Sequence, residues 1–77
     1  MKDIYYVVIS HNDDMGNDDD TTFNDIFSAY HFYEQYVNDY IKDGVNGSVE
    51  LLRVSKSTLQ HKQVMYWNSY NIGTGRE

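Results

Sequence analysis

SAYHFYEQYVNDYIKDG (residues 28–44) determines the architecture expected of this chain. Apolar side chains recur in it at intervals of three and four residues, which places them in one stripe along a helix. The members of this stripe are Ala29, Phe32, Tyr33, Tyr36, Val37, Tyr40 and Ile41. Ser28 is placed to cap the first turn, and Gly44 stands where a left-handed residue would end a helix. The spacing therefore predicts one amphipathic helix over about residues 28–43.

Segments with the composition of β-strands lie on both sides of this helix. DIYYVVIS (3–10) is rich in β-branched and aromatic residues, and residues 48–55 and 63–70 alternate in the manner of strands. FNDIF (23–27) is compatible with a short strand or with the opening turn of the helix, and we favour the strand. The fold class predicted is α+β, with one helix on a small, mostly antiparallel sheet of three to four strands (about 3–10, 23–27, 48–55 and 63–70).

The length of 77 residues predicts one small domain, residues 1–77, with a loop over 11–22 and a frayed tail over 71–77. A core of this size gives marginal stability. Twelve aromatic residues exceed what such a core can hold. Several Tyr side chains are therefore expected at the surface or in the interface of a homodimer.

Composition excludes several classes of protein and site. The chain has no Cys, which removes disulfides and thiolate metal ligands. IYYVVIS (4–10) is too short for a signal peptide or a membrane span. We expect a cytoplasmic protein without a membrane association, a metal or another cofactor.

Charge is distributed unevenly along the chain. Residues 1–45 hold ten acids against Lys2 and Lys42, whereas residues 46–77 hold two acids against four basic residues. A field of this sign repels phosphates, so direct binding of nucleic acid or of anionic lipid is not expected. The partner that complements it is a basic protein.

The acids are densest in HNDDMGNDDDTT (11–22), which admits three interpretations: a calcium loop, a solvated acidic loop, or a surface that attracts a basic partner. An EF-hand with Gly16 as its sixth residue would find an acid at Asp13 but not at the other ligand positions. A solvated loop is what most charge runs are. The third interpretation is favoured because acids continue into the next element. The candidate partner-binding residues are Asp13, Asp14, Asp18, Asp19, Asp20, Asp25, Glu34, Asp39 and Asp43.

Support for catalysis is thin. The chain has three histidines but neither a Cys nucleophile, a glycine-rich phosphate loop nor an HExxH motif. His11 next to Asp13 and Asp14 could act as a base with an orienting carboxylate, although a turn histidine beside acids is commoner. We therefore expect no enzyme and no catalytic residues.

The short, acidic chain, without Cys or Pro and rich in Tyr and Asp, resembles the small early proteins with which lytic bacteriophages take over the host cell. Among these it is similar to DNA-mimic inhibitors of host DNA-binding proteins such as HU-type nucleoid proteins, restriction enzymes or CRISPR effectors. The resemblance is one of overall character and has no defining motif. It implies a non-enzymatic inhibitor in the host cytoplasm that competes with DNA. The net basic C-terminal part departs from the pattern and implies that only one face mimics DNA.

The alternative is an adaptor or inhibitor that binds a host enzyme which does not itself bind DNA. Such a protein would use exposed aromatic residues or a sheet edge, and its aspartates would serve solubility.

Overall fold

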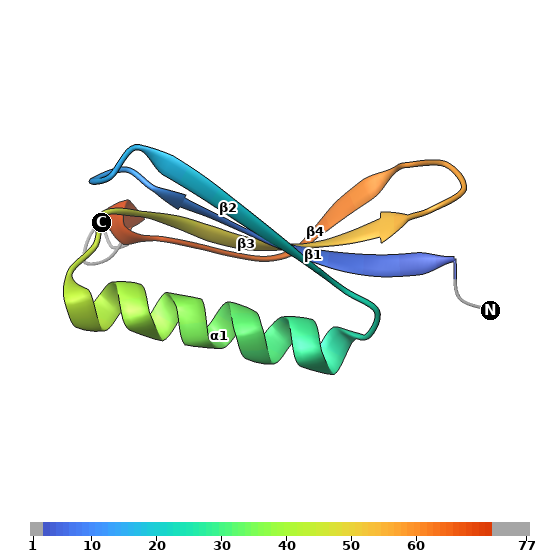
Figure 1. Ribbon diagram of the computed structural model, residues 1–77, viewed down its shortest axis with the longest axis horizontal. Helices are drawn as coiled ribbons and strands as arrows, with labels where there is room; N and C mark the ends of the chain where they lie inside the picture. The colour runs from blue at the N-terminus through green and yellow to red at the C-terminus, as the bar shows by residue number, and fades with distance from the viewer. Residues whose placement is uncertain (1–2, 72–77) are drawn as a thin grey trace.

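The computed structural model describes residues 3–71 and consists of one helix packed on one face of a four-stranded antiparallel sheet (Figure 1). The predicted α+β class is confirmed. The strands lie in the order β2-β1-β3-β4. In chain order the elements are β1 (Ile4–Asn12), β2 (Asn17–Phe23), α1 (Ile26–Asp43), β3 (Gly47–Ser55), β4 (His61–Asn68) and a 3-10 turn η1 (Ser69–Asn71).

The core lies between α1 and the two central strands. Val8, Val49 and Leu51 point from β1 and β3 toward the helix and are almost fully buried. They pack against the helix stripe, whose buried members are Ala29, Tyr33 and Tyr40. Phe32, Tyr36 and Val37 are partly buried, as the periodicity predicts. Ile41 is 54% exposed, since it lies about 100° around the helix from the buried Tyr40.

The acidic segment 11–22 is mostly strand, so the prediction of a loop is wrong there. The turn spans only residues 13–16 and closes with Gly16 in the left-handed region (φ 72°). Residues 17–23 then pair with β1, from Asn12 opposite Asn17 to Tyr6 opposite Phe23. An edge strand exposes its side chains to solvent, so this pairing outweighs the low strand propensity of aspartate.

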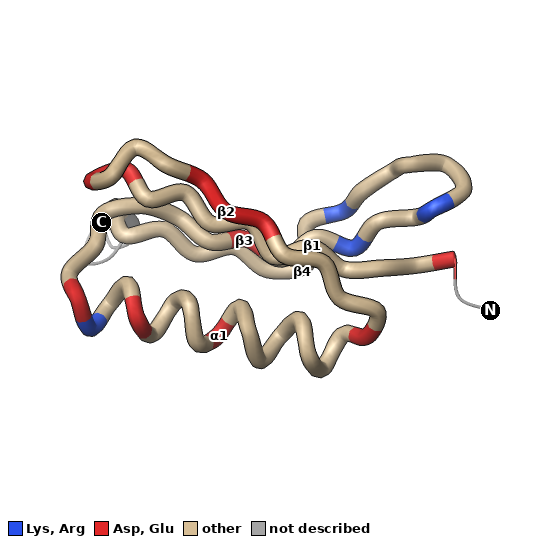
Figure 2. The backbone as a smooth tube through the Cα atoms, in the orientation of Figure 1, with Lys and Arg blue, Asp and Glu red and all other residues tan. Residues whose placement is uncertain are grey.

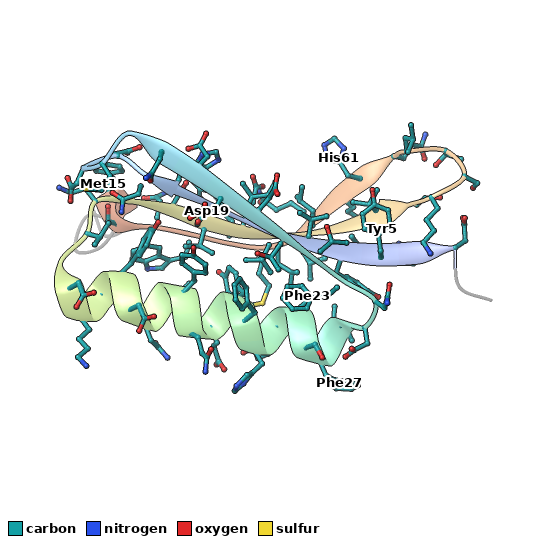
Figure 3. All side chains as sticks on the ribbon, viewed as in Figure 1. Tyr5, Met15, Asp19, Phe23, Phe27 and His61 are labelled. Atoms are coloured by element: carbon teal, nitrogen blue, oxygen red, sulfur yellow. The ribbon has the colours of Figure 1, made fainter. Side chains whose placement is uncertain are left out.

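The helix begins earlier than predicted, at Ile26, and residues 23–27 do not form a separate strand. Asp25, not Ser28, is the N-cap: its backbone is extended and its Oδ1 accepts a hydrogen bond from the Ser28 N–H at 2.9 Å. Phe27 lies on the side of α1 that points away from the sheet and is 82% exposed (Figure 3). The predicted C-terminal end is confirmed, with Gly44 at φ 69°.

The hairpin of β3 and β4 extends beyond the N-terminal end of α1, and we call residues 53–62 the arm (Figure 1). β3 matches its predicted range to within one residue. β4 begins and ends two residues earlier than predicted. It ends at Asn68 because residues 69–71 form the 3-10 turn η1. Val64 is an extra residue in β4, where the register shifts. Of the predicted frayed tail, residues 72–77 lie outside the described residues.

The capping geometry gives a first prediction. Asp25→Ala should lower the free energy of unfolding by about 1 kcal/mol, because the first turn of α1 loses the acceptor of its N–H group. Ser28→Ala should change it by only about 0.3 kcal/mol or less, since the Ser28 side chain is not the cap. Urea denaturation followed by circular dichroism measures both. Asp25→Ser should retain most of the stability, and a larger loss for Ser28→Ala than for Asp25→Ala would contradict the assignment.

Candidate acidic interface

Strand β2 places three consecutive carboxylates on an edge of the sheet (Figure 2). Successive side chains of a strand point to opposite faces. Asp18 and Asp20 therefore lie on the face away from the helix, where Asp18 Oδ1 contacts His11 Nδ1 at 2.8 Å. Asp19 lies on the helix side and accepts a hydrogen bond from the Tyr36 hydroxyl at 3.2 Å. The carboxylates thus line both sides of one strand.

Helix α1 adds two further acids beside the same strand. Its flank next to β2 carries Phe32, whose ring lies 5.2 Å from that of Phe23, and Tyr36, which reaches Asp19. Asp39 and Asp43 each follow one of these aromatic residues by seven positions, close to two helical turns. They therefore project from the same flank, toward the β2 side.

The tip of the β1–β2 hairpin contributes two acids that have partners inside the molecule. Asp13 Oδ2 accepts a hydrogen bond from the Tyr70 hydroxyl at 2.6 Å, and this bond raises the pKa of Tyr70. Asp14 accepts hydrogen bonds from the backbone and side-chain amides of Asn46 at 3.0 and 3.2 Å. These bonds hold the tip against the segments before β3 and after β4.

Two of the predicted site residues do not belong to this group. Asp25 caps the helix at its far end. Glu34 stands two positions before Tyr36, which places it near the opposite side of the helix, where it accepts a hydrogen bond from Tyr30 at 3.2 Å. The remaining seven predicted residues surround one edge of the molecule. We call them the acidic edge: Asp13, Asp14, Asp18, Asp19, Asp20, Asp39 and Asp43.

No Lys or Arg within residues 3–71 forms an ion pair with a carboxylate; the single pair recorded there is His11 with Asp18. Arg53, Lys56 and Lys62 lie in the arm, away from the acidic edge (Figure 2). Asp20, Asp39 and Asp43 form no side-chain hydrogen bond with another described residue. Their charge is therefore available to a partner.

The described chain contains no group of three or more His, Cys, Asp or Glu side chains that could hold a metal ion. The aspartates predicted to be a loop are instead divided between a strand and a hydrogen-bonded turn. His11 contacts Asp18, and neither Asp13 nor Asp14 orients it.

The tyrosines divide between core and surface, as expected for a core of this size. Tyr33 and Tyr40 are buried, and burial raises the pKa of both hydroxyls. Tyr30, Tyr66 and Tyr70 are 40%, 49% and 58% exposed. The links of Tyr36 to Asp19 and of Tyr70 to Asp13 were not predicted, because they join residues 17 and 57 positions apart without a local signal.

None of the helical structure in residues 3–71 is long and apolar enough to cross a bilayer. No protein-family model matches the chain, and neither the curated proteins nor the solved structures give a significant match. Geometry and charge therefore have to support any proposal of function.

The hydrogen bond at the tip predicts a pH dependence. Because this hydrogen bond raises the pKa of Tyr70, the contribution of the bond to stability is complete below the ordinary tyrosine pKa near 10. The contribution is lost as the pH rises through the pKa of Tyr70 in the folded protein. The stability difference between the wild-type protein and Tyr70→Phe should therefore shrink above about pH 10. Urea denaturation of both proteins from pH 7 to 11 measures it. A difference that stays constant with pH would contradict a role for this bond.

Proposed function

We propose that the protein is a non-enzymatic inhibitor of the DNA-mimic type, whose acidic edge occupies the DNA-binding surface of a basic protein. The observation that carries the proposal is the run of carboxylates along β2 and α1, none of which forms an ion pair with a described Lys or Arg; Lys42 in the last turn of α1 is the one cation of this helix. A basic protein would supply the missing cations. DNA and this edge would then compete for the same Lys and Arg side chains.

The spacing of the charges supports this proposal. A β-strand advances about 3.4 Å per residue, and successive phosphates of one DNA strand advance by about the same distance along the duplex axis. Asp18, Asp19 and Asp20 thus follow one another at the axial interval of phosphates, although they alternate between two sides. Asp39 and Asp43, about 6 Å apart along the helix axis, form a second row beside them.

Only one edge is proposed to mimic DNA. The arm, with Arg53, Lys56 and Lys62, would face away from a cationic partner, because like charges repel. An HU-type nucleoid protein is the first candidate target on the resemblance alone. The protein would act in the cytoplasm of the host cell if a phage encodes it.

The location of the charges can be tested with two double variants of equal net charge. Asp20→Asn with Asp39→Asn removes two acids of the acidic edge that have no described internal partner, and should weaken competition with DNA by about tenfold or more. Glu34→Gln with Glu50→Gln removes two acids elsewhere and should change it by about threefold or less. Displacement of fluorescent duplex DNA from an HU-type protein measures both. Equal losses in the two double variants would reject the acidic edge as the site.

Ionic strength gives a second test of the same proposal. Binding by the acidic edge should weaken by about tenfold or more between about 0.05 M and 0.5 M salt, because added ions screen solvent-exposed charges. Calorimetric titration of the target at several salt concentrations measures this dependence. An affinity that hardly changes with salt would instead favour an adaptor or inhibitor of an enzyme that does not bind DNA.

The alternative, an adaptor or inhibitor of an enzyme that does not bind DNA, is favoured by the second sheet edge. β4 is unpaired on its outer side within the described sheet, and Val64 and Tyr66 are 43% and 49% exposed there. Trp67 is unsuited as a probe of this surface, because its ring packs 6.1 Å from Tyr40 in the core. Loss of salt-resistant binding on Tyr66→Ser would identify this mode.

A further inference from the structure

A shallow groove lies in the arm, where the sheet extends past the helix. Its volume is about 610 Å³, and its lining includes Ile4, Arg53, Leu59, His61 and Lys62. The groove combines apolar side chains with cations. Neither the helix core nor the acidic edge accounts for this combination.

Within residues 3–71, the cations of the groove have no ion-pair partner. Arg53 and Lys62 stand directly opposite each other on β3 and β4, an arrangement in which like charges repel. Neither forms an ion pair with a carboxylate of residues 3–71. Asp3, the acid nearest the hairpin turn, is instead hydrogen-bonded to Ser55 and Ser57. An anionic group in the groove would relieve this repulsion.

Leu59 in the same groove carries backbone strain. It is the one non-glycine residue with a positive φ in the described chain, at 60°, a region that leucine rarely adopts. The hairpin turn holds its backbone there, because the Leu59 N–H donates to the Ser55 carbonyl at 2.8 Å, but its side chain is 72% exposed and packs against little of the monomer. The turn thus presents an apolar side chain to solvent at a fixed place in the groove, where a second molecule can contact it.

The tip of the β1–β2 hairpin has the complementary properties. Met15 is 72% exposed there, beside Asp13 and Asp14. The tip and the arm lie at opposite ends of a molecule 41 Å long, so they cannot meet within one chain (Figure 3).

We propose that the hairpin tip of one copy docks into the arm groove of a second copy. Met15 would contact Leu59 and Ile4 of the other copy. Asp13 and Asp14 keep their internal hydrogen bonds to neutral groups, so their exposed negative charge would still attract Arg53 and Lys62 of the other copy. The two surfaces differ, so a pair of copies keeps one tip and one groove open, and the assembly grows as a chain.

Complementary variants test this arrangement. Arg53→Glu with Lys62→Glu inactivates the groove, and Met15→Lys inactivates the tip. In sedimentation equilibrium, the wild-type mass should rise with concentration beyond two chains, whereas each variant alone should stay at the monomer mass of 9.1 kDa. An equimolar mixture of the two variants should form a complex of two chains and stop there. A monomeric wild type, a mass that stops at two wild-type chains, or a monomeric mixture would each overturn the proposal.

Leu59→Gly separates docking from folding. Glycine adopts a left-handed φ without strain, so the melting temperature should stay the same or rise, whereas association should weaken by about fivefold or more. Unchanged association would overturn the proposal.

Two controls separate this association from other binding. Asp20→Asn with Asp39→Asn should leave it intact, which distinguishes it from the proposed competition with DNA. Inorganic phosphate is the probe for a simple anion site. NMR shifts of groove residues on its addition, with no change in wild-type mass upon dilution, would show a phosphate site in place of docking.

Discussion

The contact between the buried side of α1 and the central strands β1 and β3 is the interaction on which the rest of the structure depends. Val8, Val49 and Leu51 form one side of it, and Tyr33 and Tyr40 form much of the other. A chain of this length builds one such apolar layer. Charged residues are therefore displaced to the places that the layer does not reach, which are the edge strand β2, the outer flanks of the helix and the arm. The acidic and basic regions are separate because most acids occur in the segments of β2 and α1, whereas Arg53, Lys56 and Lys62 occur in the arm.

The end of the sheet near the hairpin tip depends on one close approach. Gly47 pairs with Asn12, and a Cβ at Gly47 would overlap the backbone carbonyl of His11. The Gly47 N–H donates to Ser69 Oγ at 3.0 Å, so η1 also meets the sheet there. Asp13 and Asp14 bind to these same segments. The acids of the chain thus fall into two groups, one that fastens the fold and one that remains open to solvent.

Local patterns in the sequence predict most of the fold. The three- and four-residue spacing identifies the helix, and runs such as IYYVVI (4–9) identify β1. β2 was missed because consecutive aspartates have low strand propensity, and only pairing with β1 makes them a strand. Ser28 was predicted as the N-cap because a short strand was expected up to residue 27. The actual N-cap, Asp25, lies three residues before Ser28, and its side chain accepts the hydrogen bond of the Ser28 N–H.

The candidate site was only half predictable. All the acids of the site are evident in the sequence. The seven-residue spacing between Phe32 and Asp39 also places these two residues on the same side of a helix. Which side of the helix adjoins β2 depends on long-range packing, so Glu34 could not be separated from Asp39 beforehand. The arm groove was not foreseen, since it forms only where β3 and β4 pass the end of α1.

The position of β2 has a consequence for solubility. An unpaired outer strand can recruit a strand of another molecule and so begin a growing cross-β aggregate. The three aspartates of β2 oppose this, because a second copy that aligned its own β2 there would bring six carboxylates together. On the other outer strand, the extra residue Val64 interrupts the regular hydrogen-bonding ladder. Charge on one side and irregularity on the other thus protect a very small sheet from uncontrolled fibril growth.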